Sequence, residues 1–109
     1  MKNQTWSEMT SNEVEALIAS GREDVQFIDV RELAEYREGH IKAVRLIPLS
    51  QLEVRHDEID RNQETVMICR SGNRSRQACE FLASHGHLKL HNMTGGMLNW
   101  QGKTIRDES

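Results

Sequence analysis

Long hydrophobic stretches are missing from this sequence of 109 residues. No apolar run approaches the roughly 20 residues that a helix needs to cross a bilayer, and the polar start, MKNQTWSEMT, has no charged-then-apolar signal segment. Basic residues form no tract or stripe, and the formal net charge is −3. This composition argues against binding to nucleic acid or to a membrane surface. We therefore expect a cytoplasmic protein.

Cysteine is scarce as well, since Cys69 and Cys79 are the only two. They lie ten positions apart with no histidine between them, so they match neither a zinc site, which needs paired close ligands, nor a disulfide framework. His85, His87 and His91 are close in sequence but have no cysteine or carboxylate partners nearby. The sequence therefore predicts free thiols and no metal site.

Linkers, internal repeats and low-complexity segments are also absent, and the chain has one proline. A chain of this length typically forms one domain with one modest core. We expect residues 1–109 to form a single domain, with its core from about residue 8 to residue 102.

Helical and strand patterns alternate along the chain. Thr10 and Glu13 have the spacing of a capping box, as do Ser50 and Glu53, and each pair precedes a helical pattern. Buried runs such as ETVMIC lack helical periodicity and indicate strands, one of which Pro48 ends. The predicted helices span 10–20, 32–39, 50–59 and 75–86, the predicted strands span 25–30, 44–49, 64–69 and 88–93, and glycines 95 and 96 lead into a short final helix. Buried strands that alternate with helices predict an α/β fold with a parallel sheet covered on both faces.

The stretch CRSGNRS stands where the clearest strand ends and the clearest helix begins. Ligands of parallel sheets bind at this edge, and a tight turn into a helix points successive N–H groups at one spot. Gly72 and Asn73 tolerate the backbone conformation of such a turn, and Arg70 and Arg74 add positive charge. We expect this environment to hold the pKa of Cys69 below the free value of about 8.5.

The alternative for each cysteine is simple packing. A buried Cys69 at a strand end could be only a small apolar side chain, but the loop that follows it favours a reactive thiolate. Cys79 lies in the middle of a helix, where we expect core packing, with a resolving thiol as the alternative. Asp29 and Arg31 are expected to form a structural ion pair, and His40 to hold a turn by hydrogen bonds.

Four stretches resemble the single-domain rhodanese family. They are FIDVRELAEYREGHI (27–41), LIPLSQL (46–52), VMICRSGNRSRQA (66–78) and GGMLNWQ (95–101). The resemblance implies a five-stranded parallel sheet flanked by helices on both faces. It also implies a thiosulfate sulfurtransferase, whose catalytic cysteine carries a persulfide and which needs no metal or organic cofactor. Such enzymes move sulfane sulfur from thiosulfate to a thiophilic acceptor, with cyanide, thioredoxin and glutathione as candidate acceptors here.

The resemblance assigns a role to each residue of the loop. Cys69 would be the nucleophile, the backbone amides of 70–75 the cradle, and two arginines the holders of the sulfonate of thiosulfate. The expected substrate-binding residues are Arg70, Ser71, Gly72, Asn73, Arg74 and Ser75. The sequence departs from the family at Lys42 and Ala43, where many members have Pro-Gly, and in lacking a proline after the tryptophan.

Two other functions stay open. One is a rhodanese-like sulfur carrier or regulatory module that binds another protein without much free turnover. The other is a cysteine phosphatase, which uses a similar cradle on phosphate. Phosphatases have one more residue between cysteine and arginine than the four that separate Cys69 from Arg74, and the smaller loop favours sulfur transfer.

Overall fold

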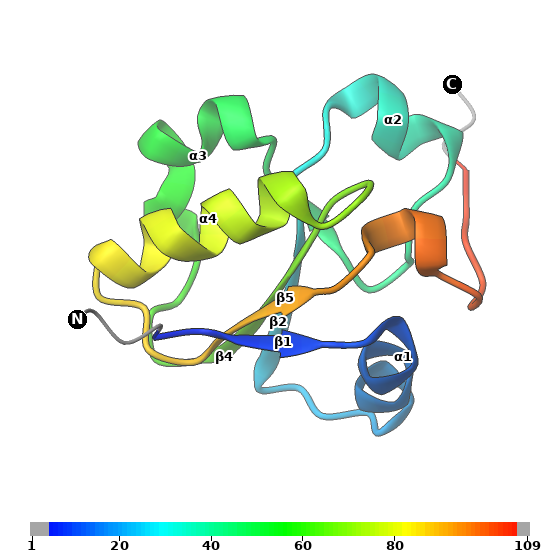
Figure 1. Cartoon of the computed structure of the whole chain (residues 1–109), viewed down its shortest axis with the longest axis horizontal. Coiled ribbons are helices and arrows are strands. Elements are labelled where there is room, and N and C mark those ends of the chain that lie inside the picture. Colours follow the sequence, from blue (N-terminus) through cyan, green and yellow to red (C-terminus); the bar gives the residue numbers. More distant parts are fainter. Residues whose placement is uncertain (1–4, 107–109) are drawn as a thin grey trace.

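Helices and strands alternate along the computed structural model, which describes residues 5–106 (Figure 1). In chain order the elements are β1 (Ser7–Met9), α1 (Ser11–Ala19), β2 (Val25–Asp29), α2 (Leu33–Glu38), β3 (Arg45–Leu46), α3 (Leu49–Arg55), η1 (His56–Glu58), β4 (Glu64–Ile68), α4 (Asn73–Ser84), β5 (Leu90–Met93) and η2 (Gly96–Asn99). Among the described helices, none combines the length and the apolar character that a membrane span requires.

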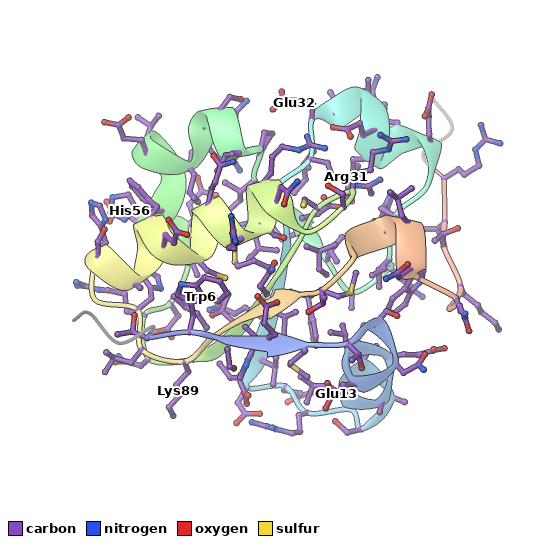
Figure 2. All side chains as sticks on the ribbon, in the orientation of Figure 1. Trp6, Glu13, Arg31, Glu32, His56 and Lys89 are labelled. Carbon is purple, nitrogen blue, oxygen red and sulfur yellow. The ribbon has the colours of Figure 1, made fainter. Side chains whose placement is uncertain are left out.

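The five strands form one parallel sheet in the order β1-β5-β4-β2-β3. The predicted α/β class and the five-stranded parallel sheet are therefore confirmed. β1 was not predicted from the residue pattern, because it has three residues and two of them are exposed. Trp6, which precedes β1, packs against the core beneath α4 (Figure 2).

Alternate residues of the central strands fill two separate cores, because successive side chains of a strand point to opposite faces. Phe27 and Val66 lie on the face covered by α1, whereas Ile28 and Met67 lie on the face covered by α3 and α4 (Figure 1). The buried members of the second group, here called the α4-side cluster, are Ile28, Val30, Ile47, Leu52, Ile59, Met67, Cys69, Ala78, Cys79, Leu82 and Leu90. Cys69 thus sits on the face where α4 packs.

Of the two predicted capping boxes, that of Thr10 and Glu13 is confirmed, and that of Ser50 and Glu53 is wrong. The Thr10 hydroxyl accepts from the Glu13 N–H at 3.1 Å, and the Glu13 carboxylate accepts from the Thr10 N–H at 2.8 Å, which completes the capping box. α3 instead begins at Leu49 after Pro48, so Ser50 lies inside the helix and caps nothing. The residues on both sides of the proline donate their N–H groups to the end of β2 at 3.0 Å. Pro48 has no N–H to donate, but no hydrogen bond to the sheet is lost, because its two neighbours make these bonds.

Candidate active site

Four residues, 69–72, connect β4 to α4, and Cys69 is the first of them. Gly72 precedes the helix with φ 100°, in the left-handed region that favours glycine. Asn73, which was expected to tolerate the same conformation, is instead the first residue of α4. Among the described residues, only glycines have a positive φ. The helix begins two residues earlier than predicted, so its first N–H groups lie close to the cysteine.

The helical turn η2 fastens the start of this loop. The N–H of Met97 donates to the Cys69 carbonyl at 2.8 Å, and the N–H of Leu98 donates to the Arg70 carbonyl at 3.0 Å. A Cβ on Gly96 would lie 2.5 Å from the carbonyl carbon of Arg70, so only glycine fits at this approach. The segment GGM therefore positions the loop, although it is far from the loop in sequence.

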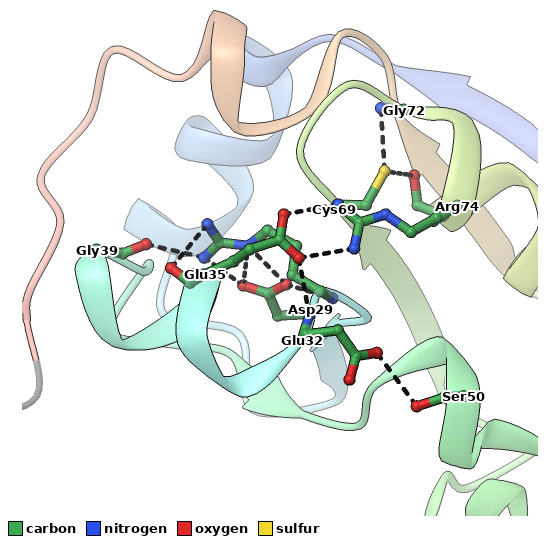
Figure 3. Close-up of polar contacts among 10 residues, drawn as sticks. Asp29, Glu32, Glu35, Gly39, Ser50, Cys69, Gly72 and Arg74 are labelled. Carbon is green, nitrogen blue, oxygen red and sulfur yellow. Dashed lines mark hydrogen bonds and ion pairs between the residues drawn. The ribbon is translucent and has the colours of Figure 1, made fainter.

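Hydrogen-bond donors surround the sulfur of Cys69, which is fully buried. The Gly72 N–H donates to Sγ at 3.0 Å, and the Ser75 hydroxyl lies 3.2 Å from it (Figure 3). Burial alone would raise the pKa of the Cys69 thiol. The Ser75 hydroxyl and the backbone N–H groups of Ser75, Gly72 and Ser71 outweigh burial, so the pKa lies below its ordinary value. This arrangement favours a thiolate.

The Ser75 hydroxyl is itself held by Asn92 on β5. It donates to Asn92 Oδ1, while Asn92 Nδ2 donates to the Gly72 carbonyl at 3.2 Å and to Glu8 Oε2 at 3.1 Å. The two acceptors of Nδ2 fix the orientation of the amide, which leaves Oδ1 facing Ser75. Sequence reasoning missed Asn92, because β5 reaches the loop only through the order of strands in the sheet.

Arg74 is occupied by a carboxylate. Its two terminal nitrogens donate to Glu35 Oε1 at 2.7 Å and Oε2 at 2.8 Å, from α4 across to α2 (Figure 3). The Arg74 hydrogen bonds lower the pKa of Glu35 to about 2, so this carboxylate is ionised at neutral pH. Sequence reasoning assigned Arg74 to the substrate and missed Glu35, since 39 positions separate them and no local pattern links them. The substrate role of Arg74 remains a prediction.

Arg70 differs from Arg74 in being exposed and available. Within residues 5–106 its guanidinium makes no hydrogen bond or ion pair, and it borders a hollow of about 310 Å³. Ser71 and Asn73 are also exposed. The hollow is lined by Arg31, Glu35, Glu38, Gly39, Arg70, Met97 and Leu98. Arg70 is thus the cation of the loop that can meet an incoming anion.

The expected ion pair of Asp29 and Arg31 is confirmed. Arg31 Nη2 lies 2.8 Å from Asp29 Oδ2, both side chains are buried, and Arg31 also donates to the Gly39 carbonyl at 2.8 Å (Figure 3). His40 Nδ1 lies 2.8 Å from the Tyr36 carbonyl, which fits the expected turn-holding role. The bonds of Arg31 tie the carboxyl end of α2 to the end of β2, and so help to fix the helix that carries the partner of Arg74.

Cys79 packs in the α4-side cluster, as predicted. Burial, followed by the nearby charges of Glu8 and Glu80, raises its pKa to about 12, so it is a thiol at neutral pH. The three clustered histidines do not share one site, because His85 and His87 border a common hollow from which His91 is absent. His91 contacts Ser7 and Glu64 on the two strands that flank β5, whereas His85 bonds to a carbonyl of the helix that it follows. Within the described part of the chain, no group of three metal-ligating side chains is found.

The fold and the loop together define a class of protein: a parallel α/β domain with a buried cysteine in the turn between a strand and the start of a helix. The sequence matches the rhodanese-like domain over residues 10–103. The chain therefore belongs to the rhodanese-like domain family.

Relatives of known sequence or structure agree with this assignment. The chain is 42% identical over 82 residues to the putative sulfur carrier protein YrkF of Bacillus subtilis; the match covers 75% of this chain but 44% of that protein, so the chain spans less than half of this relative. It is 36% identical over 93 residues to a sulfurtransferase of Allochromatium vinosum, covering 82% of this chain and 87% of that protein. The crystal structure of a rhodanese-related protein of Thermoplasma volcanium superposes with a TM-score of 0.81 at 28% identity, covering 93% of this chain and 99% of that one.

Proposed function

We propose that this protein moves sulfane sulfur from thiosulfate to a thiophilic acceptor through a persulfide on Cys69. The observation that carries the proposal is the surroundings of Sγ, where the Gly72 N–H at 3.0 Å and the Ser75 hydroxyl at 3.2 Å favour a negatively charged sulfur. The relatives named as a sulfurtransferase and a sulfur carrier support sulfur as the transferred group.

The chemistry is a pair of displacements at sulfur. The Cys69 thiolate attacks the outer sulfur of thiosulfate, the sulfur–sulfur bond of thiosulfate breaks, and its electron pair leaves with sulfite. The enzyme then holds an anionic persulfide. Cyanide or a thiolate attacks the outer sulfur of this persulfide, and the electron pair of the broken bond restores the Cys69 thiolate. These two displacements require no oxidant, reductant, metal or organic cofactor.

The loop donors contribute at each stage because negative charge stays on sulfur throughout. The backbone N–H groups are fixed before reaction, so they stabilise the thiolate and the persulfide without rearranging. Because Cys69 is buried, we expect the sulfonate of the donor to stay at the rim of the loop while its terminal sulfur approaches Sγ. We infer that Arg70, exposed at the rim, attracts the sulfonate of the donor.

Phosphate chemistry is less well supported. Four residues separate Cys69 from Arg74, and Arg74 is already paired with Glu35 at 2.7 and 2.8 Å. A phosphatase needs its loop arginine free to clamp two oxygens of a tetrahedral phosphate. Release of phosphate from p-nitrophenyl phosphate by the wild-type protein would reopen this alternative.

The test of the proposal is the intact mass of the reduced protein before and after brief treatment with thiosulfate. We expect a gain of one sulfur atom that cyanide removes, and no gain in a folded Cys69→Ala variant. A Cys79→Ala variant is the matched control and should gain the sulfur normally, since Cys79 is a buried thiol with a raised pKa. Absence of any gain in folded wild-type protein would refute thiosulfate as the donor.

A second candidate is a sulfur carrier that loads Cys69 but delivers the sulfur only to a protein partner. The likeness to the putative sulfur carrier protein favours this alternative. Steady-state turnover separates the two: an enzyme releases thiocyanate from cyanide repeatedly, and uses glutathione or thioredoxin as an acceptor. A carrier loads once and then stalls with these small acceptors.

A further inference from the structure

The two arginines of the loop are in different states. Arg74 is held by Glu35 through two parallel hydrogen bonds, whereas Arg70 is exposed and has no partner within residues 5–106. A guanidinium fork binds a carboxylate and a sulfonate through the same paired N–H groups. Glu35 therefore occupies the position on Arg74 that an oxygen pair of an anionic donor would take.

Glu35 is fixed in this position by its own helix as well. Its Oε1 also accepts the backbone N–H of Glu32 at 3.0 Å, in the first turn of α2 (Figure 3). The side chains of Arg74 and Glu35 are 32% and 31% exposed, so an incoming anion can reach the pair from solvent. With its pKa lowered to about 2 by Arg74, Glu35 remains charged at neutral pH.

We propose that Glu35 is a specificity-determining residue for the sulfur donor: its carboxylate competes with an anionic donor for Arg74 and so weakens binding of thiosulfate. This inference rests on the proposed function and deepens it. Thiosulfate first meets Arg70 and engages Arg74 only by displacing Glu35. When sulfite leaves, Glu35 takes Arg74 back, so the persulfide faces its acceptor with the second arginine neutralised. Donors without an oxyanion group gain nothing from displacing Glu35.

The first test is the variant Glu35→Gln, which keeps the shape of the side chain and removes its charge. A partly exposed ion pair contributes up to about 1 kcal/mol, which corresponds to roughly a fivefold change in binding. We expect the KM for thiosulfate to fall about fivefold. The rate at which cyanide discharges a preformed persulfide should change less than the KM, because the hydrogen bonds to the Cys69 sulfur come from Gly72 and Ser75 and not from Arg74.

The matched control is Glu32→Gln on the same helix. Glu32 carries the same charge, but its side chain accepts from Ser50 at 3.1 Å and makes no bond to Arg74. We expect its KM for thiosulfate to stay within twofold of the wild type. In the double variant Glu35→Gln with Arg74→Gln, the KM for thiosulfate should not fall, since the fall in the single variant requires a free Arg74. Thermal unfolding checks the fold of each variant, and Glu35→Asp, whose shorter side chain loosens the pair, replaces Glu35→Gln if that variant unfolds.

An unreactive anion separates this inference from the proposed function. Sulfate binding, measured by calorimetry, should be about fivefold tighter in Glu35→Gln than in the wild type, whether or not sulfur is transferred. The role of Glu35 would be overturned by any of three results in Glu35→Gln: the sulfate affinity of the wild type, an unchanged KM for thiosulfate, or a lower KM that persists when Arg74 is also replaced. Failure of thiosulfate to add sulfur to Cys69, with tighter sulfate binding in Glu35→Gln, would refute the proposed function and leave the competition intact.

Discussion

Replacing Ser75 with alanine removes the side-chain donor closest to the Cys69 sulfur and leaves the backbone turn in place. The Ser75 hydroxyl lies 3.2 Å from Sγ and is the largest of the influences that lower the pKa of Cys69 against burial. Its backbone N–H, and those of Gly72 and Ser71, remain in the variant. We therefore expect Ser75→Ala to raise the pKa of Cys69 without abolishing the thiolate.

The size of this pKa change follows from the single proton of the Ser75 hydroxyl, which has two possible acceptors, Cys69 Sγ and Asn92 Oδ1. The Ser75 hydroxyl also donates to Asn92 Oδ1, so it reaches the thiolate only by giving up that bond. A hydrogen bond to a charged group contributes about 1.5–3 kcal/mol and a neutral one about 1 kcal/mol. The net loss is then about 0.5–2 kcal/mol. The acid dissociation constant of Cys69 should fall by roughly 2-fold to 30-fold, at 1.4 kcal/mol for each factor of ten.

The assay is the rate of alkylation by iodoacetamide as a function of pH. Below its pKa, Cys69 reacts in proportion to its thiolate fraction, so the midpoint of the profile reports the pKa. Cys79 stays a thiol in this range because its pKa is raised to about 12. The matched control is Ser71→Ala, which removes an exposed hydroxyl but keeps the N–H that acts on the sulfur. An unchanged midpoint in Ser75→Ala, or an equal rise in Ser71→Ala, would refute this account of the loop.

Two further substitutions test the support of the site, each by urea unfolding with the wild type alongside. Gly96→Ala should destabilise the protein by at least about 2 kcal/mol, because its Cβ would lie 2.5 Å from the carbonyl carbon of Arg70 in a conformation with φ 58°; an unchanged midpoint would contradict the close approach. Asp29→Ala should cost about 3–5 kcal/mol, since it leaves the buried guanidinium of Arg31 without its carboxylate. A loss below about 1 kcal/mol would mean that water reaches this pair.

The parts of the fold that sequence could predict are those encoded by neighbouring residues. The capping box of Thr10 and Glu13 needs only a spacing of three, and the strand that ends before Cys69 is a single buried run. The turn at Gly72 is likewise local, because φ 100° requires a glycine. These elements place the cysteine at the carboxyl edge of a parallel sheet without any knowledge of long-range contacts.

The missed features depend on contacts between distant segments. β1 is a strand only because β5 pairs with it, since its own residues have no buried pattern. Glu35 reaches Arg74 from another helix, and Asn92 reaches Ser75 from another strand. The family resemblance supplied the count of five strands but not these partners. Sequence reasoning therefore found the loop and the nucleophile candidate, and could not find the residues that hold the loop's side chains in place.

Cys69 and Cys79 lie in the same buried cluster, yet their surroundings change thiol acidity in opposite directions. Burial raises the pKa of both, because a thiolate loses hydration when it is enclosed. Around Cys79 the charges of Glu8 and Glu80 add to burial, and the pKa rises to about 12. Around Cys69 the Ser75 hydroxyl and the N–H groups of the turn overcome burial, and the pKa falls. The turn after β4, and not the burial of the cysteine, therefore decides which of the two thiols is the more acidic.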